Sequence, residues 1–209
     1  MRVALFHDYF AKKGGGERLA LGLAKGFDAD IYTGYVDRAN TFEEIKDFRV
    51  TEIGRKLPEG LSTLYLMRKF AQLRLTGYDL YIFSGTMCIS AVEHHKPNLL
   101  YCHTPPRFMY DLYDRFMEET PFFKRCALWL LTKYLKPKDQ YYMRQFDKIM
   151  VNSGHVKERL LKYYGKAVYE KDDVVYSLID LKKFVYKGEG DFYLSYGRLD
   201  KLKRVDMII

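Results

Sequence analysis

The chain has 209 residues, of which 48% are hydrophobic and 16% aromatic, and its formal net charge is +8. This content supports a folded core and excludes a largely disordered chain. The three cysteines lack CxxC spacing, so neither a disulfide framework nor a zinc site is indicated. The N-terminal stretch is too polar for a signal peptide, and no stretch approaches the roughly 20 apolar residues of a spanning helix. We therefore expect a protein that stays inside the cell.

The positive charge is concentrated in one segment. Residues 121–171 hold twelve Lys and Arg but only four Asp and Glu, an excess equal to the net charge of the whole chain. Such a segment attracts phosphates on a nucleotide, a nucleic acid or an anionic membrane surface. Charge alone does not choose among these partners.

Short β-rich apolar runs alternate with longer amphipathic stretches along the chain. The alternation is typical of an α/β fold, a Rossmann-like open parallel sheet with helices on both faces. A first strand is expected at residues 2–6, and a glycine cluster then opens a helix over residues 17–27. Further strands are expected at residues 30–35, 48–53, 78–84, 98–103 and 148–152.

The next predicted elements are helical. Residues 122–146 are expected to form helix with a break at Pro137, because proline removes a backbone hydrogen bond and its ring collides with the preceding turn. Ser153 is expected to cap the following helix, and Gly165 to end it.

Regularity falls in the last part of the chain, where a charged stretch with two glycines suits a linker. We therefore predict a first domain at residues 1–180, a linker at 181–191 and the start of a second domain at 192–209. Within the last segment we expect a strand at 192–196, a turn at Gly197 and then a helix.

Two predicted loops follow strands at the edge where open α/β sheets bind ligands. Gly14, Gly15 and Gly16 follow the first strand, so their backbone amides could approach a phosphate at a helix N-terminus; a plain tight turn is equally compatible. His103 follows a later strand and would lie at a site, or would merely cap a loop fixed by two prolines. Arg107, in the same loop, would bind a phosphate or cover the surface.

Other polar and aromatic residues have simpler readings. Asn152 and Ser153 end a strand and begin a helix, so they act as an N-cap or also face the same crevice. His94 and His95 lack a supporting ligand, so we expect a solvated helix end and no metal. Two aromatic pairs stand among basic residues and could stack on bases or lie at a lipid interface, although core packing is the commoner fate: Phe122, Phe123, Tyr141 and Tyr142.

Four motifs occur in order along nearly the whole chain. They are GGGER at 14–18, YCHTPPRF at 101–108, VNS with His155 and Val156 at 151–156, and YLSYGRL with Lys203, Val205 and Asp206 at 193–206. Together they resemble the GT-B glycosyltransferases of family GT4, a retaining group that includes bacterial and archaeal mannosyltransferases. The resemblance implies two Rossmann-like domains facing a cleft, the first binding mainly the acceptor and the second the nucleotide-sugar donor.

The resemblance also implies roles for single residues. The loop of Gly14, Gly15 and Gly16 would approach the donor phosphates. Two cations, Arg198 and Lys203, would neutralise the diphosphate leaving group without a metal, since they stabilise charge that grows in the transition state. His103 would be the catalytic residue near the transferred sugar. The acceptor side of the cleft would be lined by Thr104, Arg107, Asn152 and Ser153.

The resulting hypothesis is a hexosyltransferase of polysaccharide biosynthesis that moves a sugar, such as mannose from GDP-mannose, onto a lipid-linked or polysaccharide acceptor. The chain would be the N-terminal half, inactive without the C-terminal domain. It would use a nucleotide-sugar co-substrate and no other cofactor, bind no nucleic acid, and lie in the cytoplasm or peripherally on the inner face of an anionic membrane. The alternatives are a non-catalytic nucleotide- or sugar-binding module, a membrane-docking module, and a nucleic-acid binder that uses the basic segment.

Overall fold

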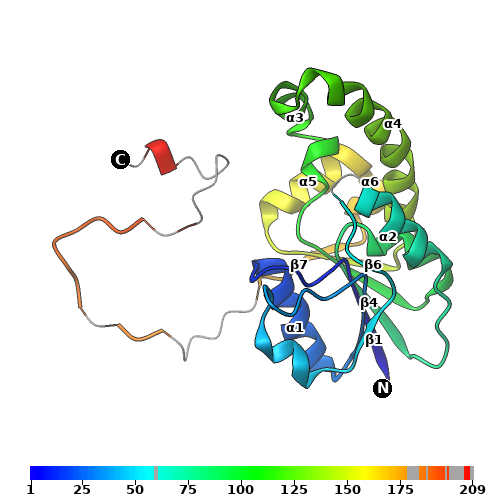
Figure 1. The fold of residues 1–209 in the computed structure, drawn as a ribbon. Coiled ribbons are helices and arrows are strands. Elements are labelled where there is room, and N and C mark those ends of the chain that lie inside the picture. The colour runs from blue at the N-terminus through cyan, green and yellow to red at the C-terminus, as the bar shows by residue number, and fades with distance from the viewer. Residues whose placement is uncertain (59–60, 178–183, 187, 196, 198–204, 208–209) are drawn as a thin grey trace. The chain divides into compact units, whose positions relative to one another are not determined.

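The computed structural model describes residues 1–58, 61–177, 184–186, 188–195, 197 and 205–207. Residues Met1–Leu178 form one compact unit and Ile179–Ile209 form a second (Figure 1). The first unit contains the sheet and the long helices. The position of 192–209 as the start of a second Rossmann-like domain stays a prediction.

The first unit is built on a seven-stranded sheet in the order β3-β2-β1-β4-β5-β6-β7, and every neighbouring pair is parallel. The strands are β1 (Val3–His7), β2 (Asp30–Thr33), β3 (Val50–Glu52), β4 (Leu80–Ser84), β5 (Asn98–Cys102), β6 (Lys148–Val151) and β7 (Asp172–Val174). The first six confirm the predicted strands. Because all strands run the same way, the loops after them gather at one edge.

Helices cover both faces of this sheet, as predicted. They are α1 (Gly15–Phe27), α2 (Leu61–Gln72), α3 (Tyr113–Glu119), α4 (Phe122–Arg144), α5 (Gly154–Tyr164) and α6 (Lys166–Tyr169), with 3-10 turns η1 (Glu43–Asp47), η2 (Cys88–His94) and η3 (Arg107–Met109). Side chains alternate along β1, so Val3 and Leu5 pack in the core that includes α1, whereas Ala4 and Phe6 pack in the core that includes α2, α4 and α5. Two buried cores therefore fix the sheet from both sides.

The predicted break at Pro137 is wrong, because α4 continues through it. An interior proline costs about 3 kcal/mol through the lost hydrogen bond and the ring clash. Here the proline is exposed, so the carbonyl left unpaired can reach water, while buried Leu135 before it and Tyr142 and Met143 after it hold the helix against the core. Tertiary packing thus overrides the local helix breaker.

The strand β7 was not predicted, because its sequence begins with two aspartates. Its hydrogen bonds come from pairing with β6, where Ile149 lies opposite Asp172 and Val151 opposite Val174. Asp172 is buried, and its Oδ1 forms an ion pair with the Nζ of Lys157 at 2.6 Å. A strand with this sequence depends on its neighbours more than on its own hydrophobicity.

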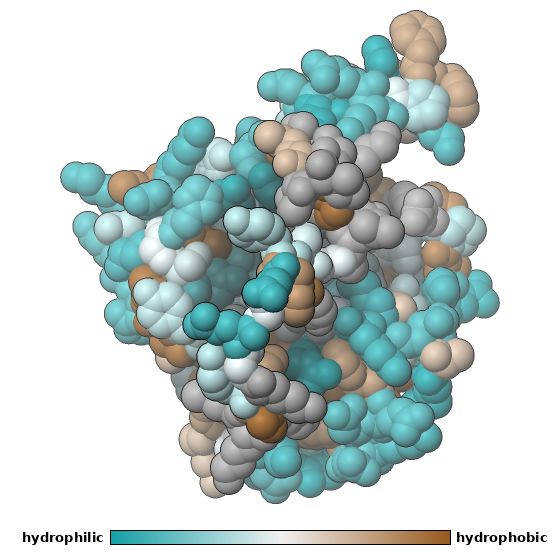
Figure 2. Space-filling view, turned by 90° about the vertical axis from the view of Figure 1, so that its left-hand side faces the viewer, coloured by the Kyte–Doolittle hydropathy of each residue, from teal (hydrophilic) through white to brown (hydrophobic). Residues whose placement is uncertain are grey.

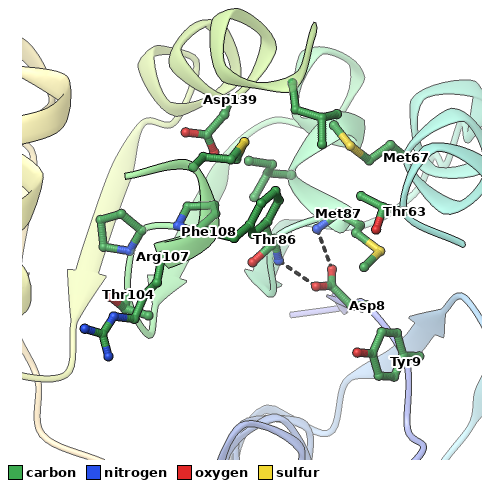
Figure 3. A pocket seen from close by; sticks show the side chains of 15 residues that line it. Asp8, Tyr9, Thr63, Met67, Thr86, Met87, Thr104, Arg107, Phe108 and Asp139 are labelled. Atoms are coloured by element: carbon green, nitrogen blue, oxygen red, sulfur yellow. Dashed lines mark hydrogen bonds between the residues drawn. The ribbon is translucent and has the colours of Figure 1, made fainter. Parts of the chain in front are cut away.

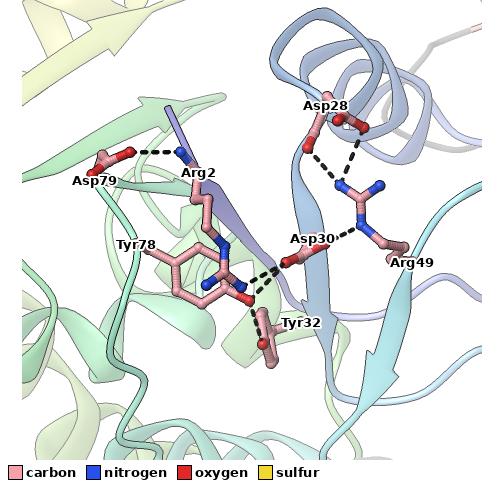
Figure 4. Close-up of polar contacts among 7 residues, drawn as sticks. All are labelled: Arg2, Asp28, Asp30, Tyr32, Arg49, Tyr78 and Asp79. Atoms are coloured by element: carbon pink, nitrogen blue, oxygen red, sulfur yellow. Dashed lines mark hydrogen bonds and ion pairs between the residues drawn. The ribbon is translucent and has the colours of Figure 1, made fainter.

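The amino ends of β1, β2 and β3 are joined by polar contacts (Figure 4). Asp30 accepts a 2.8 Å hydrogen bond from the hydroxyl of Tyr78 and also binds Arg49. The Arg49 guanidinium reaches the Asp28 carbonyl at 2.7 Å, and the Arg2 backbone N–H donates to Asp79 at 2.7 Å. Hydrogen bonds and ion pairs thus connect the amino ends of the strands, whereas ligands of open α/β sheets bind at the opposite, carboxyl end.

The second unit contains little regular structure among its described residues. The strand expected at 192–196 is not formed over 192–195, where no described residue of the unit pairs with it, and strand hydrogen bonds need such a partner. Of the helix expected after the turn at Gly197, the described residues show one 3-10 turn, η6 (Val205–Met207). Residue 196, the sequence 198–204 and part of the predicted linker lie outside the described residues.

The surface of the molecule is mainly hydrophilic on the face shown in Figure 2, where hydrophobic residues are scattered. Phe122 and Phe123 are 85% and 77% exposed, so core packing, the commoner fate of such aromatic residues, does not apply to them. In the other aromatic pair, Tyr142 is buried whereas Tyr141 is exposed. Helix α3 buries no residue, and the first buried residue of α4 is Thr132. The start of α4 therefore exposes apolar side chains.

Candidate functional site

Three polar side chains meet where β1, β4 and β5 end. His7 lies opposite Ser84 in the parallel register, and its Nδ1–H donates to the Ser84 carbonyl. His103, the first residue after β5, lies with its Nε2 2.9 Å from the Ser84 hydroxyl oxygen. The sheet therefore brings the predicted catalytic residue against the ends of two neighbouring strands.

The glycine cluster reaches the same place from the other side. Gly14 is the N-cap of α1, and Gly15 and Gly16 form its first turn. A Cβ built on Gly16 would lie 3.9 Å from the His103 ring, which makes these two predicted elements neighbours. The Glu17 carboxylate is buried and folds back so closely on Gly14 that a Cβ there would overlap it. The first turn of α1 is thus packed against the histidine.

The environment of His103 keeps its ring neutral. Burial, followed by the nearby His7, lowers the pKa of His103 from 6.5 to about 4, although Asp8 opposes the shift. Burial likewise lowers the pKa of His7. A neutral imidazole at pH 7 has one N–H donor and one acceptor. His103 is therefore suited to hold a hydroxyl group at the strand ends.

Asp8, directly after β1, organises the neighbouring loop. Its carboxylate accepts hydrogen bonds from the backbone N–H groups of Thr86 at 2.7 Å and of Met87 and Cys88 at 2.8 Å. Gly85 is required here, because a Cβ at this position would overlap the carboxylate. The acid thus caps the first turn of η2 and fixes the loop after β4 beside His103.

A cavity of about 310 Å³ opens beside these residues (Figure 3). Asp8 and Tyr9 line it from the loop after β1, and Thr104 and Arg107 from the loop after β5. Further lining residues come from α2, η2 and α4: Thr63, Met67, Met87, Ile89, Leu135 and Asp139. A volume of this order and a mixed lining of apolar and polar groups suit a small organic ligand.

Asp139 supplies a buried acid to this cavity from α4. It is 3% exposed and accepts hydrogen bonds from the hydroxyls of Tyr110 at 2.6 Å and Tyr164 at 2.7 Å. Burial raises the pKa of Asp139 to about 6, against the opposing effect of the two tyrosine hydrogen bonds. The group therefore changes its protonation state near pH 6.

The predicted cleft residues Thr104 and Arg107 are tied to α5 through Arg159, Thr104 directly and Arg107 through Asp111. Arg107 binds this carboxylate at 2.7 and 2.9 Å, and Arg159 binds it at 3.1 Å. The second nitrogen of Arg159 donates to the Thr104 hydroxyl at 2.9 Å. The Arg107 charge is thus shared with an acid, which makes it a weaker phosphate ligand than a free arginine.

The other predicted site residues have separate outcomes. Ser153 is the N-cap of α5, because its hydroxyl accepts from the Val156 N–H at 3.3 Å, and it also donates to the Asn152 side chain at 3.2 Å. These contacts confirm the cap and leave the cleft role a prediction. Arg198 and Lys203 lie outside the described residues.

The solvated helix end expected for the histidine pair is found at His94, which is exposed at the end of η2, but not at His95. His95 is fully buried, with its Nδ1–H donating to the Ala91 carbonyl at 2.6 Å and its Nε2 accepting from the Leu75 N–H at 3.1 Å. Its two hydrogen bonds satisfy both nitrogens inside the core. Among the described residues no group of three or more His, Cys, Asp or Glu could hold a metal ion.

Sequence reasoning missed several groups of this site, namely Asp8, Ser84, Asp139 and Arg159. Ser84 ends the predicted strand 78–84, and Asp8 lies two residues after the predicted strand 2–6, so the rule that singled out His103 would also have found them. Asp139 and Arg159 lie within predicted helices, where nothing local marks a residue as facing a cavity.

Comparisons with known proteins identify the family of the chain. Residues 13–183 match the family described as Glycosyltransferase Family 4. An alpha-1,3/1,6-mannosyltransferase ALG2 from Kluyveromyces lactis is 28% identical over 94% of the chain, and its counterpart from Saccharomyces cerevisiae is 30% identical over the same share. The chain spans less than half of these relatives, 44% and 43% of their lengths.

Solved structures show the same fold. Anabaena HepE in complex with UDP and glucose matches 87% of the chain with a TM-score of 0.57 and 14% identity, the chain covering 46% of that protein. The lipopolysaccharide outer core galactosyltransferase WaaB, in its apo form, matches 88% of the chain with a TM-score of 0.54 and 14% identity, 48% of it being covered. With the family match over most of its length, the chain belongs to glycosyltransferase family 4 and has the Rossmann-like architecture of half a GT-B fold.

Proposed function

We propose that the chain is the acceptor-side half of a retaining hexosyltransferase that moves mannose from a nucleotide sugar, GDP-mannose, to a lipid-linked acceptor. The observation that carries this proposal is the meeting of Gly16 and His103 beside a cavity, within a chain whose match to family 4 covers residues 13–183. The ALG2 relatives, which are named as mannosyltransferases, support the choice of sugar.

In this proposal each described residue has a limited task. The neutral His103, which is hydrogen bonded to Ser84, accepts a hydrogen bond from a hydroxyl of the transferred sugar or donates one to it. The first turn of α1 supplies backbone N–H groups toward the donor phosphates. The cavity beside Asp8 and Thr104 holds the accepting sugar, and Asp139 within it supplies a carboxyl group that exchanges a proton near pH 6. No metal takes part.

Calorimetric titration of the chain with GDP-mannose, UDP-glucose and the free nucleotides tests this division of labour. We expect weak or undetectable binding and no turnover. A chimera that continues the chain through the second half of the Saccharomyces cerevisiae relative should bind and transfer, and its transfer should fall when His103 is replaced by alanine. Tight nucleotide binding or ordinary turnover by the chain itself would contradict the proposal.

We further propose that the protein works peripherally on the inner face of an anionic membrane. Within the described residues, no helix is long and apolar enough to cross a bilayer. The N-terminal turns of α4, which with α3 project away from the sheet in Figure 1, instead expose apolar side chains, with Trp129 and Leu130 45% and 55% exposed besides Phe122 and Phe123. Exposed aromatic residues beside lysines and arginines are typical of helices that lie in a membrane interface.

Flotation with vesicles of phosphatidylglycerol or phosphatidylcholine tests the membrane proposal. The chain should float with the anionic vesicles at low salt, and replacing both Phe122 and Phe123 by serine should reduce flotation. Replacing Leu161, which is also about two-fifths exposed but lies on α5, should have no effect. Flotation that changes neither with salt concentration nor with the charge of the lipid would contradict an electrostatic contribution to membrane binding.

A further inference from the structure

A second hollow, of about 600 Å³, lies between α2 and α4. Its walls are apolar along their length, with Leu64, Met67 and Ala71 on α2 and with Tyr134 and Tyr142 on α4. Each helix also contributes one cation, Arg68 and Lys138. The groove therefore combines a hydrophobic surface with two positive charges.

The two cations have no acidic partner in the described part of the chain. Arg68 is exposed and forms no ion pair there. Lys138 forms none either, and its ammonium lies over the face of the Tyr134 ring, 5.1 Å from the ring centre. By contrast, Arg49, Arg107 and Arg115 each bind a carboxylate on the surface of this protein. Two unpaired cations over an apolar groove match an anion that carries a hydrocarbon chain.

The groove connects two features already described. Met67 lines both this groove and the cavity beside Asp8, so the two hollows share a wall. In the other direction, Phe123, Leu130, Tyr134 and Lys138 fall on one side of α4 at helical spacing. From Phe123 to Lys138 this stripe is about 22 Å long, at 1.5 Å per residue.

We infer that the groove between α2 and α4 binds the phosphate-bearing lipid part of the acceptor, an inference that rests on the proposed function. The phosphate contacts Arg68 and Lys138, and the chain lies on Leu64, Met67 and Tyr142. The attached sugar then reaches over Met67 into the cavity beside Asp8. The stripe along α4 leads the lipid from the exposed aromatic residues at the start of the helix to this groove.

The test uses farnesyl phosphate, kept below the concentration at which it aggregates, and measures its binding to the full chain by calorimetry. Replacing both Arg68 and Lys138 by glutamine should weaken binding about 30-fold, taking about 1 kcal/mol for each cation near a lipid phosphate. The matched control replaces Lys25 and Lys46, two exposed lysines of α1 and η1 on the other face of the sheet, and should bind as the parent does. Leu64→Gln, at an exposed position, should also weaken binding, while inorganic phosphate and farnesol should each bind at least about tenfold more weakly than farnesyl phosphate.

Thermal unfolding of each variant shows whether it is folded, so a loss of binding is not mistaken for a loss of structure. Equal affinities of the Arg68/Lys138 variant and its control would overturn the inference, as would inorganic phosphate binding as well as farnesyl phosphate. Binding of phosphatidylglycerol vesicles alone, without monomeric farnesyl phosphate, would assign these cations to the membrane surface and would also overturn it. The titration contains no nucleotide sugar, so a negative result leaves the transferase proposal standing, and failure of sugar transfer leaves this binding result unchanged.

Discussion

The low pKa of His103 makes the stability of the fold depend on pH in a direction that can be measured. The ring has its ordinary pKa of 6.5 in the unfolded chain and a pKa of about 4 when folded. Between these values the unfolded chain binds a proton that the folded chain does not, so the free energy of unfolding rises with pH across the window from 4 to 6.5. The contribution is fully present above the window and is lost as pH falls.

The size of this effect follows from the two pKa values. Relative to pH 8, protonation of the unfolded chain removes about 2 kcal/mol at pH 5 and about 3 kcal/mol once pH falls below 4. The substitution His103→Gln keeps a group that can hydrogen bond to Ser84 but removes the titration. The difference in unfolding free energy between parent and variant should therefore shift by about 2 kcal/mol, against the parent, from pH 8 to pH 5.

Urea unfolding of both proteins at half-unit steps of pH measures this difference, in which the titration of groups away from His103, such as Asp139, largely cancels. His7 and Asp8 lie close to His103 and affect its pKa, so the same series in a His7→Gln background separates the two histidines. If the difference in unfolding free energy stays constant between pH 8 and pH 5, or moves in favour of the parent, the statement that His103 is buried and neutral is refuted.

Three further predictions follow from the packing and titration of single residues. Gly85→Ala should lower the free energy of unfolding by about 3 kcal/mol, because the added Cβ displaces the Asp8 carboxylate from its three N–H donors. Gly15→Ala is the control, and it should be neutral or stabilising because nothing lies within 4 Å of the new Cβ. Chemical unfolding of both variants measures the two effects. Pro137→Ala should raise the melting temperature, since it restores a helix hydrogen bond worth up to about 3 kcal/mol with the ring clash removed, and an unchanged or lower melting temperature would contradict the account of α4. Asp139→Asn should remove a pH effect of opposite sign to that of His103. The folded pKa of Asp139, about 6, lies above its ordinary value of 3.8, so the parent loses stability relative to the variant as pH rises through 6. Urea unfolding of both proteins at pH 4 and pH 7 would detect this loss.

The sequence was sufficient for most of the sheet and for the position of the site. Runs rich in β-branched and aromatic residues predicted six strands, and their parallel direction then placed His103 at the same edge as the glycine cluster. That inference needed no side-chain detail, and Gly16 does lie against the His103 ring. Ser153 was also predictable as a cap, because its bond to the Val156 N–H is local.

The errors share a physical cause, since each depended on contacts distant in sequence. Pro137 breaks a helix by local rules, but α4 is held by the core on both sides of it. His95 looks like a surface residue beside His94, yet its ring reaches the Leu75 N–H twenty residues earlier. The acidic start of β7 resembles a loop until β6 supplies its hydrogen bonds. Sequence patterns indicate local conformational preference, whereas the structure at these residues is determined by tertiary contacts.

The charges at the strand ends favour the proposed division between acceptor and donor halves. His103 is neutral at pH 7, the Asp8 carboxylate is occupied by three backbone N–H groups, and Asp111 offsets Arg107 and Arg159. Near the glycine cluster, the side chain of Lys12 passes 3.5 Å from the Cβ position of Gly14, and in the described part of the chain it forms no ion pair. One exposed lysine offsets only part of the charge on a departing diphosphate. In the proposed function, the remaining compensation comes from cations such as those predicted at Arg198 and Lys203. We therefore expect the described residues to hold sugar hydroxyls well but nucleotide sugars weakly.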